Sequence, residues 1–343
     1  MALDRKSLFT LAKQVANANP SAPVAYSWNE EKFSYGDLQE TLRNELREIA
    51  GTYQLFRENK NTVFTLLEET IDDVLPKRVL EQYGQFAEIK TYPQGVKPVF
   101  TQRITEAAKR RAKQFVTKVG LAGIYEVFKL DGRSYEVPTS AFGGAAQIGF
   151  EEFLDGRVDF ADVLEIVLEG LDRSIYIEIE RALKGAVENL QDANKSVQTS
   201  FDEAEMDRLL QIADSYGKAT IYCTFEFAAT MVPSEGWRSD EMKNQRWNNG
   251  YLANYKGHQV IVLPQSFEDD TNTVKVIDPS YAWIIPAGSG EKPVKVAFEG
   301  GTIVREYENR DLSREIQMYK KVGVAAIITN NLCVYRNTEL VQQ

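Results

Sequence analysis

The sequence is poor in the residues from which most catalytic and metal sites are built. Its 343 residues include one histidine, His258, and two cysteines, Cys223 and Cys333. A lone histidine cannot complete a familiar zinc site, and two distant cysteines cannot form a disulfide framework. The sequence also lacks a Walker loop, a G-x-S-x-G elbow and a G-x-G-x-x-G motif after a strand. We therefore predict a protein that is not an enzyme, with no catalytic residue, no metal and no cofactor.

Positive charge and long apolar runs are scarce as well. The chain has 40 basic and 50 acidic residues, a net charge of −10 and an isoelectric point near 5.0. Binding of nucleic acid through bulk charge needs a basic surface, so we expect DNA to lie near this protein without sequence-specific binding. The longest apolar runs, such as residues 322–328, are too short to span a membrane, and the charged start MALDRKSLF is no signal peptide. These absences predict a soluble protein, made in the cytoplasm, that has no membrane partner.

The most prominent feature that is present is a long amphipathic stretch from Asp159 to Leu190. Apolar residues recur there at steps of three or four, which predicts one helix over residues 159–190. At 1.5 Å per residue this helix would be roughly 45 Å long, which suits a helix that backs a sheet or spans a large flat domain. Acidic residues recur with the same steps on the opposite face; they are Asp162, Glu165, Glu169 and Asp172.

The first 86 residues predict helices and loops that form no domain of their own. We expect helices within residues 1–18, 37–49 and 61–86, the last of them broken at Pro76 because proline disrupts a helix interior. Their apolar faces need a partner, and we expect that partner to be mainly another subunit. The apolar side chains in question are Leu8, Phe9, Phe64, Leu67 and Ile71.

From about residue 87 the apolar period changes to two, which is typical of strands. We predict strands at 87–91, 97–103, 114–119, 124–130, 134–137 and 147–154, with Asp131-Gly132 as a hairpin turn. Between the second and third of these strands lies the most basic cluster of the chain, formed by Lys109, Arg110, Arg111 and Lys113. On its own this cluster favours a solvated loop or helix turn over a binding surface.

Residues 191–200 are polar and form the best candidate for a domain boundary. Beyond them we predict helices at 202–216 and 240–255, the second interrupted at Asn249-Gly250. The strands predicted there are 219–225, 259–263, 274–277, 281–285, 292–298, 302–307, 322–329 and 332–335. Helices and strands alternate without regular βαβ spacing, so the predicted fold class is α+β.

The order of these elements resembles the major capsid proteins of tailed bacteriophages, the fold named after phage Hong Kong ninety-seven. Three segments carry the resemblance: AFGGAAQIGFEEFLDG, then DFADVLEIVLEGLDRSIYIEIERAL, and the closing SREIQMYKKVGVAAIITNNLCVYRN. It covers nearly the whole chain and rests on pattern and order. It implies an N-terminal arm (1–86), an extended β-loop (87–140), a peripheral domain with the long helix as its spine (141–200 and 299–343), and an axial domain (201–298).

The resemblance also implies a function and a set of partners. The expected function is a structural head protein that self-assembles into hexamers and pentamers of an icosahedral or prolate shell around double-stranded DNA, in the virion. The expected partners are other copies of the chain, a portal protein and decoration proteins, with a separate scaffolding protein because no long segment precedes the arm. An encapsulin-like nanocompartment shell and a cytoplasmic enzyme of unrecognised type are the alternatives.

In the resembling family the extended loop reaches over the peripheral domain of a neighbour. We therefore predict that the basic cluster docks on an acidic surface of the next subunit. That surface would combine the carboxylates of the long helix with three that precede it, Glu151, Glu152 and Asp155. A covalent link from Lys109 or Lys113 to Asn330, Asn331 or Asn337 of a neighbour is a further option that the family offers.

Overall fold

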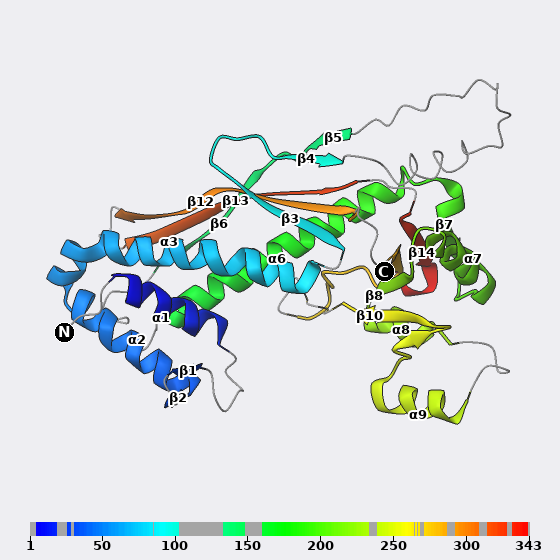
Figure 1. The fold of residues 1–343 in the computed structure, drawn as a ribbon, viewed down its shortest axis with the longest axis horizontal. Helices are drawn as coiled ribbons and strands as arrows, with labels where there is room; N and C mark the ends of the chain where they lie inside the picture. Colours follow the sequence, from blue (N-terminus) through cyan, green and yellow to red (C-terminus); the bar gives the residue numbers. More distant parts are fainter. Residues whose placement is uncertain are drawn as a thin grey trace, which may run out of the picture.

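The computed structural model folds into two units that lie end to end, an elongated unit and a compact unit (Figure 1). It describes residues 5–18, 26–28, 31–84, 86–102, 133–147, 160–232, 239–263, 265, 267, 271–286, 292–308, 314–327 and 331–341. Helices and strands are mixed in both units, and the predicted α+β class is confirmed.

The elongated unit is built on a four-stranded sheet with the order β3-β12-β13-β6. At its centre two long strands, β12 (Val294–Glu308) and β13 (Arg314–Ala326), pair antiparallel. β3 (Ala87–Tyr92) lies parallel to β12 at one edge, and β6 (Ser140–Gln147) lies antiparallel to β13 at the other. The sheet thus joins segments from the beginning, the middle and the end of the chain.

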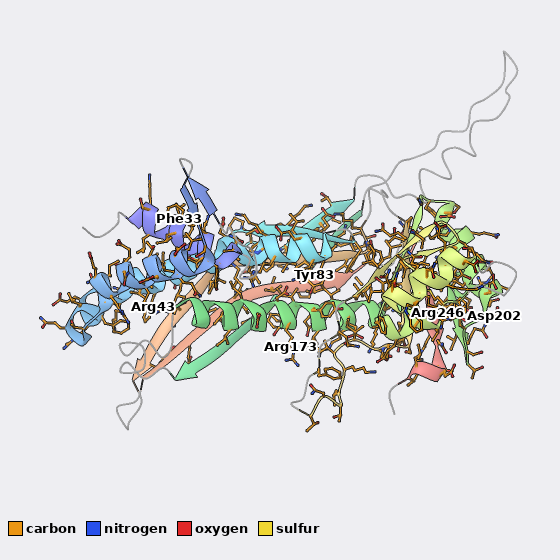
Figure 2. All side chains as sticks on the ribbon, turned by 90° about the horizontal axis from the view of Figure 1, so that it is seen from below. Phe33, Arg43, Tyr83, Arg173, Asp202 and Arg246 are labelled. Atoms are coloured by element: carbon orange, nitrogen blue, oxygen red, sulfur yellow. The ribbon has the colours of Figure 1, made fainter. Side chains whose placement is uncertain are left out.

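Two long helices, α3 (Tyr53–Tyr83) and α6 (Phe160–Val187), cover one face of this sheet. They contact each other and pack on β12 and β13 respectively, side by side along the length of the unit (Figures 1 and 2). Val294, Val296 and Phe298 alternate along β12 and are fully buried in the core between helices and sheet, as their spacing predicted. The apolar face predicted for the long helix is likewise confirmed from Leu168 to Leu183.

The N-terminal helices add a second layer on α3. α1 (Arg5–Asn17) and α2 (Tyr35–Ala50) pack on α3 and on each other, and a short hairpin of β1 (Tyr26–Trp28) and β2 (Glu31–Phe33) precedes α2. Ser34 and Asp37 begin α2 with a capping box, in which each side chain accepts the backbone N–H of the other residue. The arm is therefore a packed part of the elongated unit.

Pro76 does not break α3, contrary to the expectation from the sequence. The helix continues through Pro76 to Tyr83, although proline removes one intrahelical hydrogen bond. Leu75 and Val79, on either side of it, are completely buried. The reason is that packing on both sides of the proline offsets a cost of about 3 kcal/mol.

The other face of the sheet is partly covered by a two-stranded hairpin. β4 (Val99–Gln102) pairs antiparallel with β5 (Arg133–Glu136), and Phe100 and Val137 pack on Ala297 of β12. The predicted strands 114–119 and 124–130, and the turn Asp131-Gly132, lie outside the described residues. Here β5 takes β4 as its partner.

The compact unit contains a six-stranded sheet with the order β7-β14-β11-β8-β10-β9. Its strands are β7 (Lys195–Gln198), β8 (Ala219–Cys223), β9 (Asn254–Tyr255), β10 (His258–Val262), β11 (Tyr281–Pro286) and β14 (Cys333–Asn337). Its helices are α7 (Glu203–Asp214), α8 (Phe225–Thr230) and α9 (Asp240–Asn249), with 3-10 turns at Asp192–Asn194 and Thr338–Leu340. A second apolar core, which includes Phe227 and Tyr335, lies on one side of this sheet. Side chains on the other side of the sheet, such as Tyr222, Trp283 and Val334, belong to the core of the elongated unit.

Several predicted boundaries do not coincide with the observed elements. β7 and β14 belong to the sheet of the compact unit, although residues 195–198 and 333–337 were expected in the peripheral domain. β12 is one strand with a bulge where two strands were expected, and β13 begins eight residues earlier than predicted because it pairs along all of β12. Residues 274–277 form only an isolated bridge at Lys275. A strand lies at 140–147, and residues 148–154 of the predicted strand lie outside the described residues. α9 ends at Gly250, where φ is 79°, and does not resume.

Among the helices that the structure describes, none combines the length and the hydropathy needed to cross a membrane.

Candidate assembly surfaces

The apolar side chains of the arm are buried within their own chain. Leu8, Phe64, Leu67 and Ile71 are at most 8% exposed in the single subunit, and Phe9 is half-buried against the same core. The prediction that these residues are buried mainly against other subunits is therefore wrong. The sequence suggested it because no apolar partner lies nearby in the chain. In the structure α1 and α2 pack on α3 and on each other, and α3 packs on β12, β3 and α6.

Polar contacts also fix the arm in place. The Arg78 guanidinium of α3 donates to the Ala16 carbonyl 2.8 Å away, just before the end of α1. Lys13 and Lys77 both contact the Asp73 carboxylate, at 2.8 Å and 2.7 Å. Desolvation acts to raise the pKa of Asp73, but these two ammonium groups outweigh it and lower the pKa overall.

A buried ion pair locks α3 to the bulge of β12. The register of β12 shifts between Glu299 and Ile303. The Lys320 side chain, 2% exposed, donates to Asp72 Oδ1 at 2.5 Å and to the Gly300 carbonyl at 2.8 Å. The same Asp72 oxygen accepts the backbone N–H of Thr302 at 2.8 Å and its hydroxyl at 2.6 Å. One turn earlier on α3, the carboxylate of Glu68 also accepts a backbone N–H of β12.

Glu68 provides that second contact, accepting the backbone N–H of Val304 at 2.8 Å. The bulge frees backbone N–H groups that the strand ladder would otherwise use, and the two carboxylates of α3 satisfy them. Gly300 has φ of 67° and a Cβ there would lie 3.0 Å from Gln94, so the position requires glycine. We call Asp72, Lys320, Gly300 and Thr302 the bulge lock.

A second polar cluster joins α6 to the compact unit. Glu180 Oε1 accepts the backbone N–H of Asp278 at 2.6 Å, and Lys184 lies between the two carboxylates at 3.1 Å and 3.4 Å. Burial raises the pKa of Glu180, although the Asp278 N–H and Lys184 counteract it. Arg173, labelled in Figure 2, donates to the Phe267 carbonyl. α6 is therefore anchored in both units.

Of the carboxylates predicted to form an acidic surface on the long helix, the structure describes the side chains of Glu169 and Asp172. Glu169 is exposed as expected. Asp172 is half-buried, its Oδ1 is buried without a hydrogen-bond partner, and burial raises its pKa against the lowering effects of Gln82 and Arg78. At about 100° per residue Asp172 lies only about 40° around the helix from Leu168, so it borders the buried face. The side chains of Asp162 and Glu165, and residues Glu151, Glu152 and Asp155, lie outside the described part.

The basic cluster Lys109, Arg110, Arg111 and Lys113 also lies outside the described residues. Of the asparagines considered for a covalent link, Asn331 and Asn337 are 2% and 0% exposed within their own chain. A lysine of a neighbour could not reach them without local unfolding, so these two candidates are excluded. Asn330 is outside the described residues.

The residues first considered for catalysis have structural surroundings. His258 Nδ1 lies 3.3 Å from the Ala219 carbonyl, and its Nε2 lies 3.5 Å from Asp214. Cys223 and Cys333 are buried thiols, and burial raises the pKa of each to about 12. The thiolate is the reactive form, so both side chains stay inert near neutral pH. Within the described ranges, no group of three or more His, Cys, Asp or Glu could hold a metal ion.

A groove of about 230 Å³ lies between α6 and the sheet. Its lining includes Gly143, Gly144, Gly170, Leu171 and Met318. The space beside Gly144 and Gly170 is open, since a Cβ added at either residue would have no heavy atom within 4 Å. Its described lining has no carboxylate, histidine, lysine or cysteine, and its polar side chains are the hydroxyls of Ser174, Thr302 and Tyr319.

Sequence reasoning missed two features that are prominent in the structure. One is the bulge lock, whose ion pair joins residues 248 positions apart. The other is Trp247 on α9, which is 90% exposed. One sequence signal could have pointed to Trp247. The helix predicted at 240–255 contains a tryptophan but has no apolar stripe.

Comparison with known families places the chain among capsid proteins. A family model described as "SPbeta prophage-derived putative capsid protein YonB" matches residues 7–334. The match covers both units and the segments between them. A search of curated proteins found no match.

Several solved structures are similar to this chain at low sequence identity. The mature capsid of bacteriophage PhiM1 covers 75% of this chain and 86% of its own, at 8% identity and a TM-score of 0.48. The head of Helicobacter pylori bacteriophage KHP40 covers 75% and 90%, at 12% identity and 0.46. The SrpI encapsulin of Synechococcus elongatus covers 73% and 86%, at 12% identity and 0.44.

The assignment to a family rests on the family model, which confirms the capsid resemblance that the order of elements in the sequence predicted. On that match, the chain belongs to the YonB family of prophage-derived capsid proteins, structural proteins of a viral shell.

Proposed function

We propose that this chain is the major head protein of a tailed phage or prophage, with a shell of the Hong Kong ninety-seven type. It assembles into hexamers and pentamers of an icosahedral or prolate shell that encloses double-stranded DNA. It is assembled in the host cytoplasm and resides in the virion. The observation that carries this proposal is the capsid-family match over residues 7–334.

The shape of the two units supports different roles for them within such a shell. The elongated unit, with its long helices and sheet locked together, supplies a stiff plate that suits the peripheral domain. The compact unit, with its own core, suits the axial domain. We place residues 195–198 and 333–337 with the proposed axial part and residues 294–298 with the proposed peripheral part, because strands of those segments share a sheet with the respective unit.

The partners follow from the same proposal. Other copies of the chain form the shell, a separate scaffolding protein guides assembly, and a portal protein occupies one vertex. Decoration proteins are open to experiment. A net charge of −10 keeps packaged DNA from adhering to the shell through bulk charge.

Electron microscopy of the purified protein, alone and coexpressed with the neighbouring structural genes of its prophage, tests the proposal. Closed particles with five- and six-fold capsomers, containing nuclease-protected DNA when produced from the induced prophage, are expected. Particles that hold a cargo enzyme and no DNA would favour the encapsulin-like alternative. A monomer by light scattering under every condition of concentration, salt and coexpression would overturn shell formation itself.

We also propose that the basic cluster docks on the acidic surface of a neighbour. Exposed Glu169 supports a role for the long helix, and Glu165 lies one turn before it. Asp172 is removed from the proposed surface because it borders the buried face. Lys109, Arg110, Arg111 and Lys113 remain the proposed basic side.

A further inference from the structure

The hairpin of β4 and β5 is held on the sheet by one buried aromatic ring. Phe100 of β4 is 2% exposed and packs with Val137 and Ala297 in a small core that is separate from the main one. The ammonium groups of Lys90 and Lys295 lie 4.9 Å and 5.8 Å from the centroid of this ring. A cation over an aromatic face is attracted to it, more strongly where water is excluded. Charge as well as apolar contact therefore holds the ring in place.

The side chains of β3 complete the surroundings of this ring. Glu88 pairs with Lys295, which lies directly opposite it on β12, and with Lys90 at 2.7 Å. The Tyr92 ring packs edge-on against the same phenylalanine, with centroids 6.0 Å apart, and its hydroxyl donates to the Val99 carbonyl at 2.8 Å. β4 is thus attached to the sheet through both its side chain and its backbone.

A second attachment joins the two ends of the hairpin to each other and to β12. Glu299, 7% exposed, accepts the backbone N–H of Gly95 before β4 at 3.1 Å, and it also accepts the hydroxyl of Thr139 after β5. A Cβ at Gly323 of β13 would lie 2.5 Å from the Pro138 carbonyl oxygen, so the chain that leaves β5 lies directly on the sheet. One carboxylate therefore fixes both ends of the hairpin.

Two separate attachments determine a direction, since a segment held at one point can pivot and a segment held at two cannot. β4 ends at Gln102 and β5 begins at Arg133, and the basic cluster belongs to the residues between them. Each exposed charge pair contributes little, and ordering a loose segment on binding reduces affinity. A docking that depends on such pairs therefore benefits from a segment whose direction is already fixed.

We infer that Phe100 and Glu299, which we call the hairpin anchors, are positioning residues that fix the direction in which the hairpin presents the basic cluster to a neighbouring copy. This inference rests on the proposed docking of that cluster. The anchors act through the cluster, and their own partners lie within the same chain.

Distances between two spin labels test the anchoring in unassembled, full-length subunits. The labels are attached at Thr101→Cys on β4 and Glu81→Cys on α3, both at exposed positions. The native cysteines, Cys223 and Cys333, are 1% and 0% exposed and do not take up label. The distribution of distances should be narrow with Phe100 present and broad after Phe100→Ala. An equally narrow distribution after Phe100→Ala would overturn the inference.

The yield of particles tests the role in assembly. In low salt Phe100→Ala should lower the yield to that of Arg110→Glu with Arg111→Glu, because both variants lose a correctly presented cluster. Adding Phe100→Ala to the arginine double variant should cause no further loss, and the yield of Phe100→Ala should not change in 1 M salt. A merely destabilised subunit would multiply the two losses, and that result would overturn the inference.

Control variants separate the anchors from the hairpin as a whole. Val99→Ala, at the neighbouring position that is 39% exposed, should keep the narrow distribution and the wild-type yield. Phe100→Leu, which refills the space, should recover most of both. Circular dichroism should show that Phe100→Ala stays folded, because the ring lies outside the main core.

The remaining outcomes distinguish this inference from the proposed function. A loss from Val99→Ala as large as that from Phe100→Ala would overturn the inference alone. A wild-type yield from the arginine double variant would overturn the docking of the cluster and the role of the anchors, while shell formation stands. A wild-type chain that never self-associates would overturn the proposed function and the inference with it.

Discussion

The elongated unit and the compact unit both rest on a sheet, but different contacts hold their helices in place. In the compact unit, Phe227 packs edge-on against Tyr335 with ring centroids 5.8 Å apart, and both are fully buried. In the elongated unit, the carboxylate of Asp72 meets the buried ammonium of Lys320 across the bulge of β12. One unit therefore relies on apolar packing where the other adds buried charge.

The two units also differ in how far apart in the sequence their segments lie. Most of the compact unit comes from residues 195–286, with β14 added. The sheet of the elongated unit joins residues 87–92 and 140–147 to residues 294–326, with α3 laid over them. The apolar pattern of a long strand excludes a slip by one residue but not by two, because side chains alternate with a period of two, whereas a charge pair at a bulge has one geometry. The bulge lock thus defines where α3 sits on β12.

The largest effect should come from the compact core. Phe227→Ala should lower the free energy of unfolding by about 3 to 5 kcal/mol, because it removes a large, fully buried ring and leaves a cavity. Hydrogen exchange should show amides of β8 and β14 losing protection while those of β12 keep it. Phe225→Ala, at an exposed ring in the same helix, should cost less than about 1 kcal/mol in urea unfolding. Equal loss of protection in both sheets would show that the two cores unfold as one.

The bulge lock should give the next largest effect. Asp72→Ala leaves the Lys320 ammonium buried without its partner and should cost about 3 kcal/mol or slightly more, measured by urea unfolding. Protection should be lost at the bulge of β12 and not in the compact sheet. Asp72→Ala combined with Lys320→Met should recover most of the loss, since replacing a buried pair with apolar groups is often neutral.

Asp73 provides the control for this experiment, since it is the next residue of α3 and its contacts are more exposed. Asp73→Ala removes the pairs with Lys13 and Lys77, and such exposed pairs contribute about 0 to 1 kcal/mol each. A loss for Asp73→Ala as large as that for Asp72→Ala would mean that the buried geometry of Lys320 is not what matters.

A smaller, pH-dependent effect is expected at Asp172, where α6 faces α3. Burial raises the pKa of this carboxyl in the folded chain above its ordinary value. The stability that the group contributes is thus fully present below its unfolded pKa and is lost as pH rises through its folded pKa. Asp172→Asn should therefore stabilise the protein near neutral pH by about 1 kcal/mol, and the gain should shrink as the pH falls. Urea unfolding followed from acid to neutral pH measures this difference, and a gain that stays constant with pH would contradict the prediction.

The sequence predicted the elements whose signals are local. The apolar stripe of α6, the alternation of Val294, Val296 and Phe298, and the end of α2 at Gly51 all depend on neighbours within a few residues. The same reasoning placed Asp172 on a solvated face, because spacing alone does not say how wide the buried face is. The family match confirmed the capsid resemblance that came from the order of the elements.

What the sequence could not predict depends on segments that meet only in the fold. The Asp72–Lys320 pair requires both the bulge in β12 and the position of α3, and neither leaves a short motif. The continuation of α3 through Pro76 depends on tertiary packing around Leu75 and Val79. β14 joins the compact sheet because β11 and β7 flank it, which its own apolar residues do not reveal.

The smallest effect per contact is expected from the proposed docking of the basic cluster. Each exposed pair contributes only about 0 to 1 kcal/mol, but several pairs per subunit repeat around a shell. Arg110→Glu with Arg111→Glu should leave the subunit folded and soluble, and should lower the yield of particles in low salt. In 1 M salt the yield of wild-type particles should fall to that of the arginine double variant, because the Debye length falls to about 3 Å.

Compensation on the acidic side makes this test specific. Adding Glu165→Lys and Glu169→Lys to the arginine double variant should partly restore assembly, because the signs of both surfaces are then reversed. Lys6→Glu with Lys218→Glu changes the net charge equally at two exposed positions outside the cluster, and should leave the yield near that of the wild type. If the arginine double variant assembles as well as the wild type in low salt, the cluster is a solvated loop. The contacts between copies that the proposed shell requires would then lie on other surfaces.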